Sequence, residues 1–307
     1  MNKLSLAFIP VLFFCGSAFS QRAISAISLV PGRSVAVLSF DWNKVRRDGE
    51  LNRMVRGDEL ADLLEQIGAP GDRVNEVAMF ADLDPTPSNK LGMIVSGRFA
   101  SAAIIKSLEA RDWQKEKIGA RIAYKNPADG SYLMVLSGGV FVAGTRAAVE
   151  QTGAVLSNPR NAMVRRAGFG SIMSHLGPAA PVRFFIGIPE EYKAVADFAF
   201  KIATKLMSFT GMGIMGMIFD KIGLIQSMGF AMSARGDFYP VHLVVAMPDK
   251  TRAAVASGGL NLIKKGAWML KEESLESRAL KTMVIESSGN LLSIKFDMPK
   301  NALPPRH

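Results

Sequence analysis

A pattern of apolar residues recurs in this chain after 150 positions (230 minus 80), and this repeat limits what the chain can fold into more than any other feature. Residues 76–103 align with residues 226–253 without a gap. Phe80-Ala81 then matches Phe230-Ala231, and Val95 matches Val245. A repeat of this length carries one supersecondary unit per copy, so the chain is predicted to hold two similar units in tandem. The alternative is chance agreement, because apolar strands resemble one another.

Each copy shows the apolar alternation of strands, with turn residues such as Gly, Pro, Asn and Asp between them. In the first copy we expect strands at 34–40, 76–83, 90–97, 120–125, 131–136 and 140–143, and helices at 42–57, 58–67, 101–110 and 145–156. In the second copy we expect strands at 182–188, 226–234 and 239–247, helices that begin at 189 and 249, and a hairpin over 282–296.

This order of elements predicts an α+β fold of two tandem β-α-β-β-α-β-β repeats of the ferredoxin-like type, with mainly antiparallel sheets and helices on one face. The predicted boundaries are a signal peptide at 1–20, a first repeat at 21–157, a linker with a short helix at 158–181, a second repeat at 182–298 and a disordered tail at 299–307. The sequence leaves open whether the two repeats share one sheet.

The first twenty residues are typical of a cleavable secretory signal. Lys3 supplies the positive start, an apolar run follows over 4–14, and Ala18 and Ser20 are the small residues that a signal peptidase reads, which predicts a cut before Gln21. The apolar run is shorter than the ~20 residues that a membrane-spanning helix needs. We therefore expect an exported protein, periplasmic or extracellular and soluble after cleavage. An uncleaved anchor and a lipid attached to Cys15 are the alternatives.

Charge and cysteine content bound the chemistry of the exported chain. Cys15 is the only cysteine, so the mature chain would have no disulfide, no thiol nucleophile and no cysteine-ligated metal. Loss of Lys3 leaves 36 basic and 27 acidic residues, a net charge of +9 (36 minus 27). Such a chain would meet anionic envelope lipid or polysaccharide, or a protein partner. The charges are scattered without interleaved aromatic residues, so no nucleic acid partner is expected.

No catalytic motif or cofactor motif stands out. The sequence lacks a nucleophile elbow, a phosphate loop and a zinc-binding His-Glu-x-x-His helix. His175 and His242 fit structural roles, at the end of a short helix and in an apolar strand, and Asp82 with Asp84 resembles an ordinary surface pair. The tripeptide Arg235-Gly236-Asp237 is predicted to be a hairpin turn and not an adhesion motif. No catalytic residue, metal or cofactor is therefore expected.

The segment 206–232 is unusually rich in methionine and glycine and poor in charge. Its methionines could pack as core between the copies, form a pliable surface for an apolar ligand or lipid, or ligate copper(I) through Met212-x-x-Met215-x-Met217. The candidate surface comprises Met207, Met212, Met215, Met217 and Met228. The function predicted first is a non-catalytic binding or scaffold protein of the cell envelope. A carrier of an apolar ligand comes second and a hydrolase of unrecognised type third.

Overall fold

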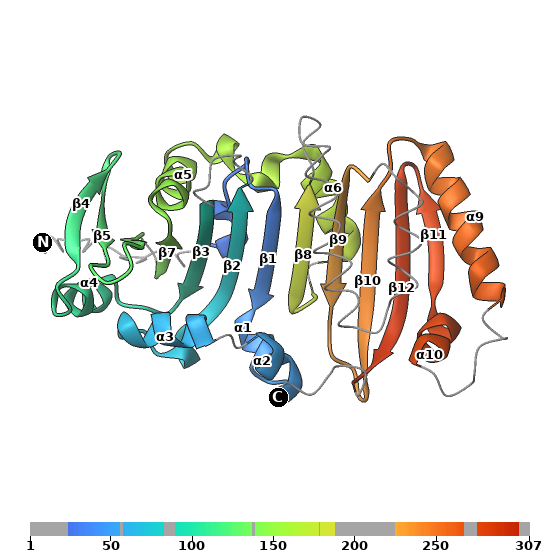
Figure 1. Cartoon of the computed structure of the whole chain (residues 1–307), viewed down its shortest axis with the longest axis horizontal. Helices are drawn as coiled ribbons and strands as arrows, with labels where there is room; N and C mark the ends of the chain where they lie inside the picture. The colour runs from blue at the N-terminus through green and yellow to red at the C-terminus, as the bar shows by residue number, and fades with distance from the viewer. Residues whose placement is uncertain are drawn as a thin grey trace, which may run out of the picture.

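One continuous antiparallel sheet organises the protein (Figure 1). The computed structural model describes residues 24–55, 58–82, 90–136, 139–177, 179–187, 225–266 and 275–300. In these ranges twelve strands lie in the order β11-β12-β10-β9-β8-β1-β2-β3-β7-β6-β5-β4, and every neighbouring pair is antiparallel. The mixed α+β class and the mainly antiparallel sheet are thus confirmed.

Most elements follow the predicted segments, but the helix predicted over 42–57 is divided in two and the strand at 114–118 was not predicted. The strands are β1 (Ala36–Asp41), β2 (Val74–Asp82), β3 (Lys90–Gly97), β4 (Gln114–Ile118), β5 (Arg121–Lys125), β6 (Tyr132–Val135), β7 (Val140–Gly144), β8 (Val182–Gly187), β9 (Ser227–Met232), β10 (Phe238–Ala246), β11 (Val284–Ser288) and β12 (Leu291–Pro299). The helices are α1 (Trp42–Val45), α2 (Gly49–Val55), α3 (Asp58–Gln66), α4 (Ser101–Glu109), α5 (Arg146–Ser157), α6 (Ala167–Leu176), α9 (Lys250–Gly266) and α10 (Leu275–Thr282), with 3₁₀ turns η1 (Ala26–Leu29), η2 (Gly71–Arg73), η3 (Pro159–Asn161) and η4 (Met163–Arg165).

Local signals in the sequence account for where several elements begin and turn. Asp41 caps α1 by accepting a hydrogen bond from the amide of Lys44 at 3.2 Å, and Thr145 caps α5 in the same way. Gly236 adopts a φ of 56° in the turn between β9 and β10, a backbone conformation that favours glycine. This turn confirms the structural interpretation of Arg235-Gly236-Asp237.

Helices cover both faces of the sheet, so the prediction of helices on one face was wrong. Helices α1 to α4, α9 and α10 pack on one face, where Leu51 and Leu108 belong to the same buried cluster as strand residues. On the other face η1, α5 and α6 enclose a second cluster that contains Val149 and Ile172. The cause is that central strands bury side chains on both faces, as the burial of residues 241–246 shows.

The contact between α6 and β9 depends on a glycine. A Cβ on Gly229 would collide with the side chain of Ile172 and lie 2.8 Å from that of Leu176, both on α6. We expect Gly229→Ala to lower the free energy of unfolding by about 1–3 kcal/mol because the helix must move. Gly170→Ala is the matched control, since nothing lies within 4 Å of a Cβ there and alanine favours the helix. Urea unfolding measures both, and equal stability of the two variants would contradict this packing.

The two halves of the sheet meet where β1 pairs with β8. We call β1 to β7 the N-terminal half and β8 to β12 the C-terminal half. The pairing runs from Ala36 opposite Ile186 to Phe40 opposite Val182, so the sheet continues from one half into the other without a break. The question that the sequence left open is thereby answered, since the halves share one sheet.

A polar cluster also joins the two halves beside α2. The hydroxyl of Tyr239 on β10 donates to Glu50 Oε2 at 2.7 Å, and Lys300 Nζ donates to Asp48 Oδ2 at 3.0 Å. The ammonium of Lys300 also lies 5.3 Å from the centre of the Tyr239 ring. We call Asp48, Glu50, Tyr239 and Lys300 the inter-half cluster.

Within the described ranges, no helix combines the length and the apolar character that a membrane crossing requires.

Candidate functional site

A groove of ≈ 530 Å³ lies on the sheet beside α3, and we call it the α3 groove. Its floor is formed by β1, β2, β3 and β8, and its walls come from α3, from Trp113 and from the loop before β6. This volume lies in the range of small-molecule sites, about 300–1,000 Å³. The lining residues are Ala36, Val37, Leu38, Asp62, Leu63, Gln66, Met79, Phe80, Ala81, Leu91, Gly92, Met93, Trp113, Asp129, Ser131, Tyr132, Ala143, Gly144 and Phe184.

Strand register brings the apolar floor of the groove together. Leu38 lies opposite Met79 on one side and opposite Phe184 on the other, and Met79 in turn lies opposite Met93. Directly opposed residues of an antiparallel pair present their side chains on the same face. These four side chains therefore form one apolar row across four strands.

The apolar row remains partly open to solvent. Met79 is 40% exposed, and Leu91 at the rim is 56% exposed. Contiguous exposed apolar surface on a folded protein often marks a binding site. The polar side chains of Asp62 and Asp129 lie at the edge of the lining, so the groove combines an apolar floor with a few polar groups.

Of the methionines predicted to form an apolar-ligand surface, only Met228 lies among the described residues. Met228 is on β9, is 6% exposed and belongs to the buried cluster on the α3 face of the sheet. Met207, Met212, Met215 and Met217 lie outside the described residues, as does the copper(I) motif. Cys15, Asp84 and His307 lie outside them too. Residues of the α3 groove were not among the predicted site residues.

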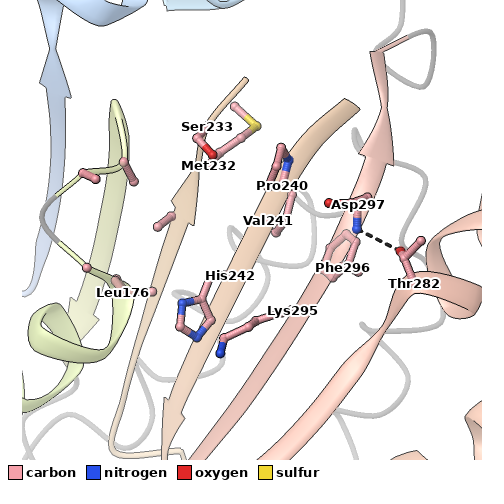
Figure 2. A pocket seen from close by; sticks show the side chains of 14 residues that line it. Leu176, Met232, Ser233, Pro240, Val241, His242, Thr282, Lys295, Phe296 and Asp297 are labelled. Carbon is pink, nitrogen blue, oxygen red and sulfur yellow. Dashed lines mark hydrogen bonds between the residues drawn. The ribbon is translucent and has the colours of Figure 1, made fainter. Parts of the chain in front are cut away.

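A second hollow of ≈ 350 Å³ lies at the C-terminal end of α6, over β9, β10 and β12 (Figure 2). We call it the α6 cleft. His242 on β10 and Lys295 on β12 are directly opposed residues, and both side chains lie in the cleft. His242 Nε2 forms a hydrogen bond with Ser293 Oγ at 2.9 Å. Ser293 could not be recognised as a partner of this histidine from sequence alone, because 51 positions separate them.

The electrostatics of the α6 cleft argue against catalysis by this pair. Burial, together with the positive charges of Lys295 and His175, lowers the pKa of His242 to about 4, against the opposing effect of Glu286. A general base works best when its pKa lies near the working pH, so this imidazole is a poor proton acceptor for Ser293 at neutral pH. His175 itself is exposed at the end of α6, where its Nδ1 lies 2.9 Å from the carbonyl of Ser171.

The remaining candidate residues have ordinary partners. Gln151 donates a long hydrogen bond of 3.5 Å to Asp82, and Arg235 forms an ion pair with Asp297 at 3.0 Å. Among the described residues, no group of three or more His, Cys, Asp or Glu side chains is placed to hold a metal ion.

Comparison with known proteins places the chain in a class of fold and not in a named family. No family model and no curated protein matches the sequence. The class is the α+β fold with one large antiparallel sheet described above. Solved structures of TP0453 are similar to it: crystal form IV has 14% identity and a TM-score of 0.52, and crystal form I has 12% identity and a TM-score of 0.50. Each match covers 92% of this chain and 96% of that one. At such identity the likeness concerns the fold alone.

Proposed function

We propose that this chain is an exported, non-catalytic binding protein of the cell envelope that carries an apolar ligand, an acyl chain or a lipid, in the α3 groove. One observation carries this proposal, the partly exposed row of Leu38, Met79, Met93 and Phe184 along the floor of a ≈ 530 Å³ groove. Burial of apolar ligand surface on this row would supply the binding free energy, roughly 0.8 kcal/mol for each methylene removed from water.

The groove favours a carrier over a pure scaffold, the two functions that the sequence placed first. A scaffold needs no hollow, whereas a carrier needs an apolar one with few polar groups. The positive charge of the mature chain, +9 (36 minus 27), would attract anionic envelope lipid or polysaccharide to the protein without specifying the ligand. Catalysis by His242 and Ser293 is not proposed, for the electrostatic reason given above.

Binding of a fluorescent fatty acid tests the carrier function. Cis-parinaric acid is expected to gain fluorescence on titration into the protein, and non-fluorescent dodecanoate to displace it. No gain at micromolar protein would contradict the proposal.

Export is tested separately by expression in a Gram-negative host. The protein should appear in the periplasm with Gln21 as its first residue, as N-terminal sequencing would establish. Recovery of acylated Cys15 would instead support a lipid-anchored form.

The tandem repeat also stays a proposal, and the strand order supports it. Outward from the central pair, the order is β1-β2-β3-β7-β6 on one side and β8-β9-β10-β12-β11 on the other. In the N-terminal half Met93 lies opposite Ala143, and in the C-terminal half Leu243 lies opposite Ile294. Leu243 follows Met93 by 150 positions (243 minus 93), and Ile294 follows Ala143 by 151 positions (294 minus 143). The hypothesis of a duplication would be contradicted by an experimental structure in which the strands of residues 34–136 do not superpose on those of residues 182–298.

A further inference from the structure

The α6 cleft is separate from the α3 groove, because it opens on the opposite face of the sheet. Its walls are small or apolar and include Leu176, Gly177 and Ala180 from the end of α6 and Ala231 from β9. Leu176 and Ala231 belong to the buried cluster on the α6 face, whereas the floor of the α3 groove packs with the other cluster. An inference about the cleft is therefore independent of the proposed carrier function.

Two basic side chains, His242 and Lys295, line this cleft side by side, and Arg183 continues their row across the sheet outside the cleft. Arg183 on β8 lies opposite Ala231, Ala231 lies opposite His242, and His242 lies opposite Lys295. Neighbouring strands are about 4.8 Å apart, so Arg183 and His242, which lie two strands apart, are separated by roughly 10 Å. Between them stands only the short side chain of Ala231. The row therefore has an open position at Ala231, with Arg183 on one side and His242 on the other.

The acidic groups near the cleft do not neutralise this row fully. Glu286 on the neighbouring strand is 3.7 Å from Lys295, but both side chains are more than half exposed, so solvent screens their attraction. Asp297 itself lines the cleft, and its carboxylate is paired with Arg235 at 3.0 Å. Arg183, outside the cleft, lies 3.8 Å from Glu76.

The surroundings of His242 show that, among the described residues, the cleft lacks negative charge next to the imidazole. The positive charges of Lys295 and His175 add to burial in disfavouring protonation of His242. Such a site gains most from a ligand that brings an oxyanion, because the anion offsets both like-charge repulsion and desolvation.

We propose that the α6 cleft binds the oxyanion of a small organic ligand, a carboxylate or a phosphate, between Lys295 and His242. The ≈ 350 Å³ volume suits a small molecule, and Leu176 and Ala231 offer apolar contact for its uncharged part. Ser293, already hydrogen-bonded to His242, holds the imidazole in place.

Protonation of His242 reports binding directly in the unmodified protein. An anion within about 4–6 Å favours the charged imidazole, so benzoate or inorganic phosphate should raise the pKa of His242, which is about 4 without a ligand, by about one unit or more. The charged groups around this imidazole are His175 from α6, Lys295 and Asp297 from the neighbouring strand β12, Glu286 from β11 beyond it, and Arg183 from β8 on the other side of β9. NMR titration of the imidazole at constant ionic strength measures this pKa, with benzoate and phosphate in separate arms that identify the preferred anion.

A matched pair of variants then locates the site. Lys295→Met is expected to weaken binding of the preferred anion about tenfold or more, because it removes a charge-assisted contact. Lys115→Met, on the distant strand β4 and also exposed, should leave binding unchanged. The proposal is overturned if neither anion moves the pKa of His242, if neutral benzamide binds as tightly as benzoate, or if Lys295→Met binds like the wild type.

Discussion

Replacing Met79 with Asp should weaken binding of cis-parinaric acid by at least about tenfold. Met79 lies in the middle of the apolar row of the α3 groove, between Leu38 and Met93, and is 40% exposed. The Asp carboxylate would lose its hydration where an acyl chain covers it and would gain no hydrogen-bond partner in return. Such a loss costs about 1–3 kcal/mol in comparable substitutions. Because the side chain is partly exposed already, the fold should tolerate the change.

The control makes the same chemical change far from the groove. Val255 on α9, which packs beside β11 and β12 at one end of the sheet, is 71% exposed, so Val255→Asp should bind the probe as the wild type does. Met79→Leu should also retain binding, since it keeps the apolar surface. Equal affinities for Met79→Asp and Val255→Asp, with both proteins folded by circular dichroism, would show that the probe binds elsewhere.

The second large effect is expected at the inter-half cluster. Tyr239 is fully buried and donates to Glu50 at 2.7 Å, so Tyr239→Phe leaves a carboxylate short of a hydrogen bond. We expect a loss of about 1–2 kcal/mol in the free energy of unfolding, because a hydrogen bond to a charged but only half-buried carboxylate is removed. A double-mutant cycle with Glu50→Gln measures the coupling of the two side chains. Additive losses would contradict the contact.

The same cluster predicts a dependence of stability on pH. Burial by itself raises the pKa of Asp48, but hydrogen bonds from the amide of Leu51 and from Lys300, with the charge of Lys300, outweigh it and hold the pKa below its ordinary value of 3.8. A carboxyl whose folded-state pKa is lowered stabilises the protein above its unfolded-state pKa, and this contribution disappears as the pH falls through the folded-state value.

Asp48→Asn should therefore reduce stability at pH 7, by about 1 kcal/mol because the site is partly solvated, and its effect should shrink as the pH falls below the ordinary value of 3.8. Urea unfolding at several pH values measures the difference between wild type and variant. If Asp48→Asn loses the same unfolding free energy at pH 7 and at pH 3, the ionised carboxylate of Asp48 is not the cause of that loss.

The sequence predicted most elements but not how they are layered. Strand positions followed from apolar runs and turn residues, which are local signals. The runs over 140–143 and 241–247 are nearly continuous in apolar residues, which is typical of strands buried on both faces. The expectation of helices on one face was drawn from the order of the elements, which does not show that these strands bury both of their faces. Strand β4 was not predicted, because its residues Gln114 to Ile118 are mostly charged, as edge strands often are.

Neither hollow could be located from the sequence, because both depend on strand register between distant segments. The floor of the α3 groove unites Leu38, Met79 and Phe184 from three strands, and no short motif connects them. His242 and Ser293 meet for the same reason, since β10 and β12 are neighbours in the sheet although α9, α10 and β11 separate them in the chain. Register across such distances is set by tertiary packing and not by local pattern.

Fluorescence quenching of Trp113 tests binding in the α3 groove most directly. Trp113 lines the groove, and Trp42→Phe with Trp268→Phe would leave it as the only tryptophan. We predict that 9,10-dibromostearate quenches its emission at saturation, that unbrominated stearate does not, and that adding Met79→Asp abolishes the quenching at the same concentration. Unchanged Trp113 emission while dibromostearate is shown to be bound would contradict an acyl chain in the α3 groove.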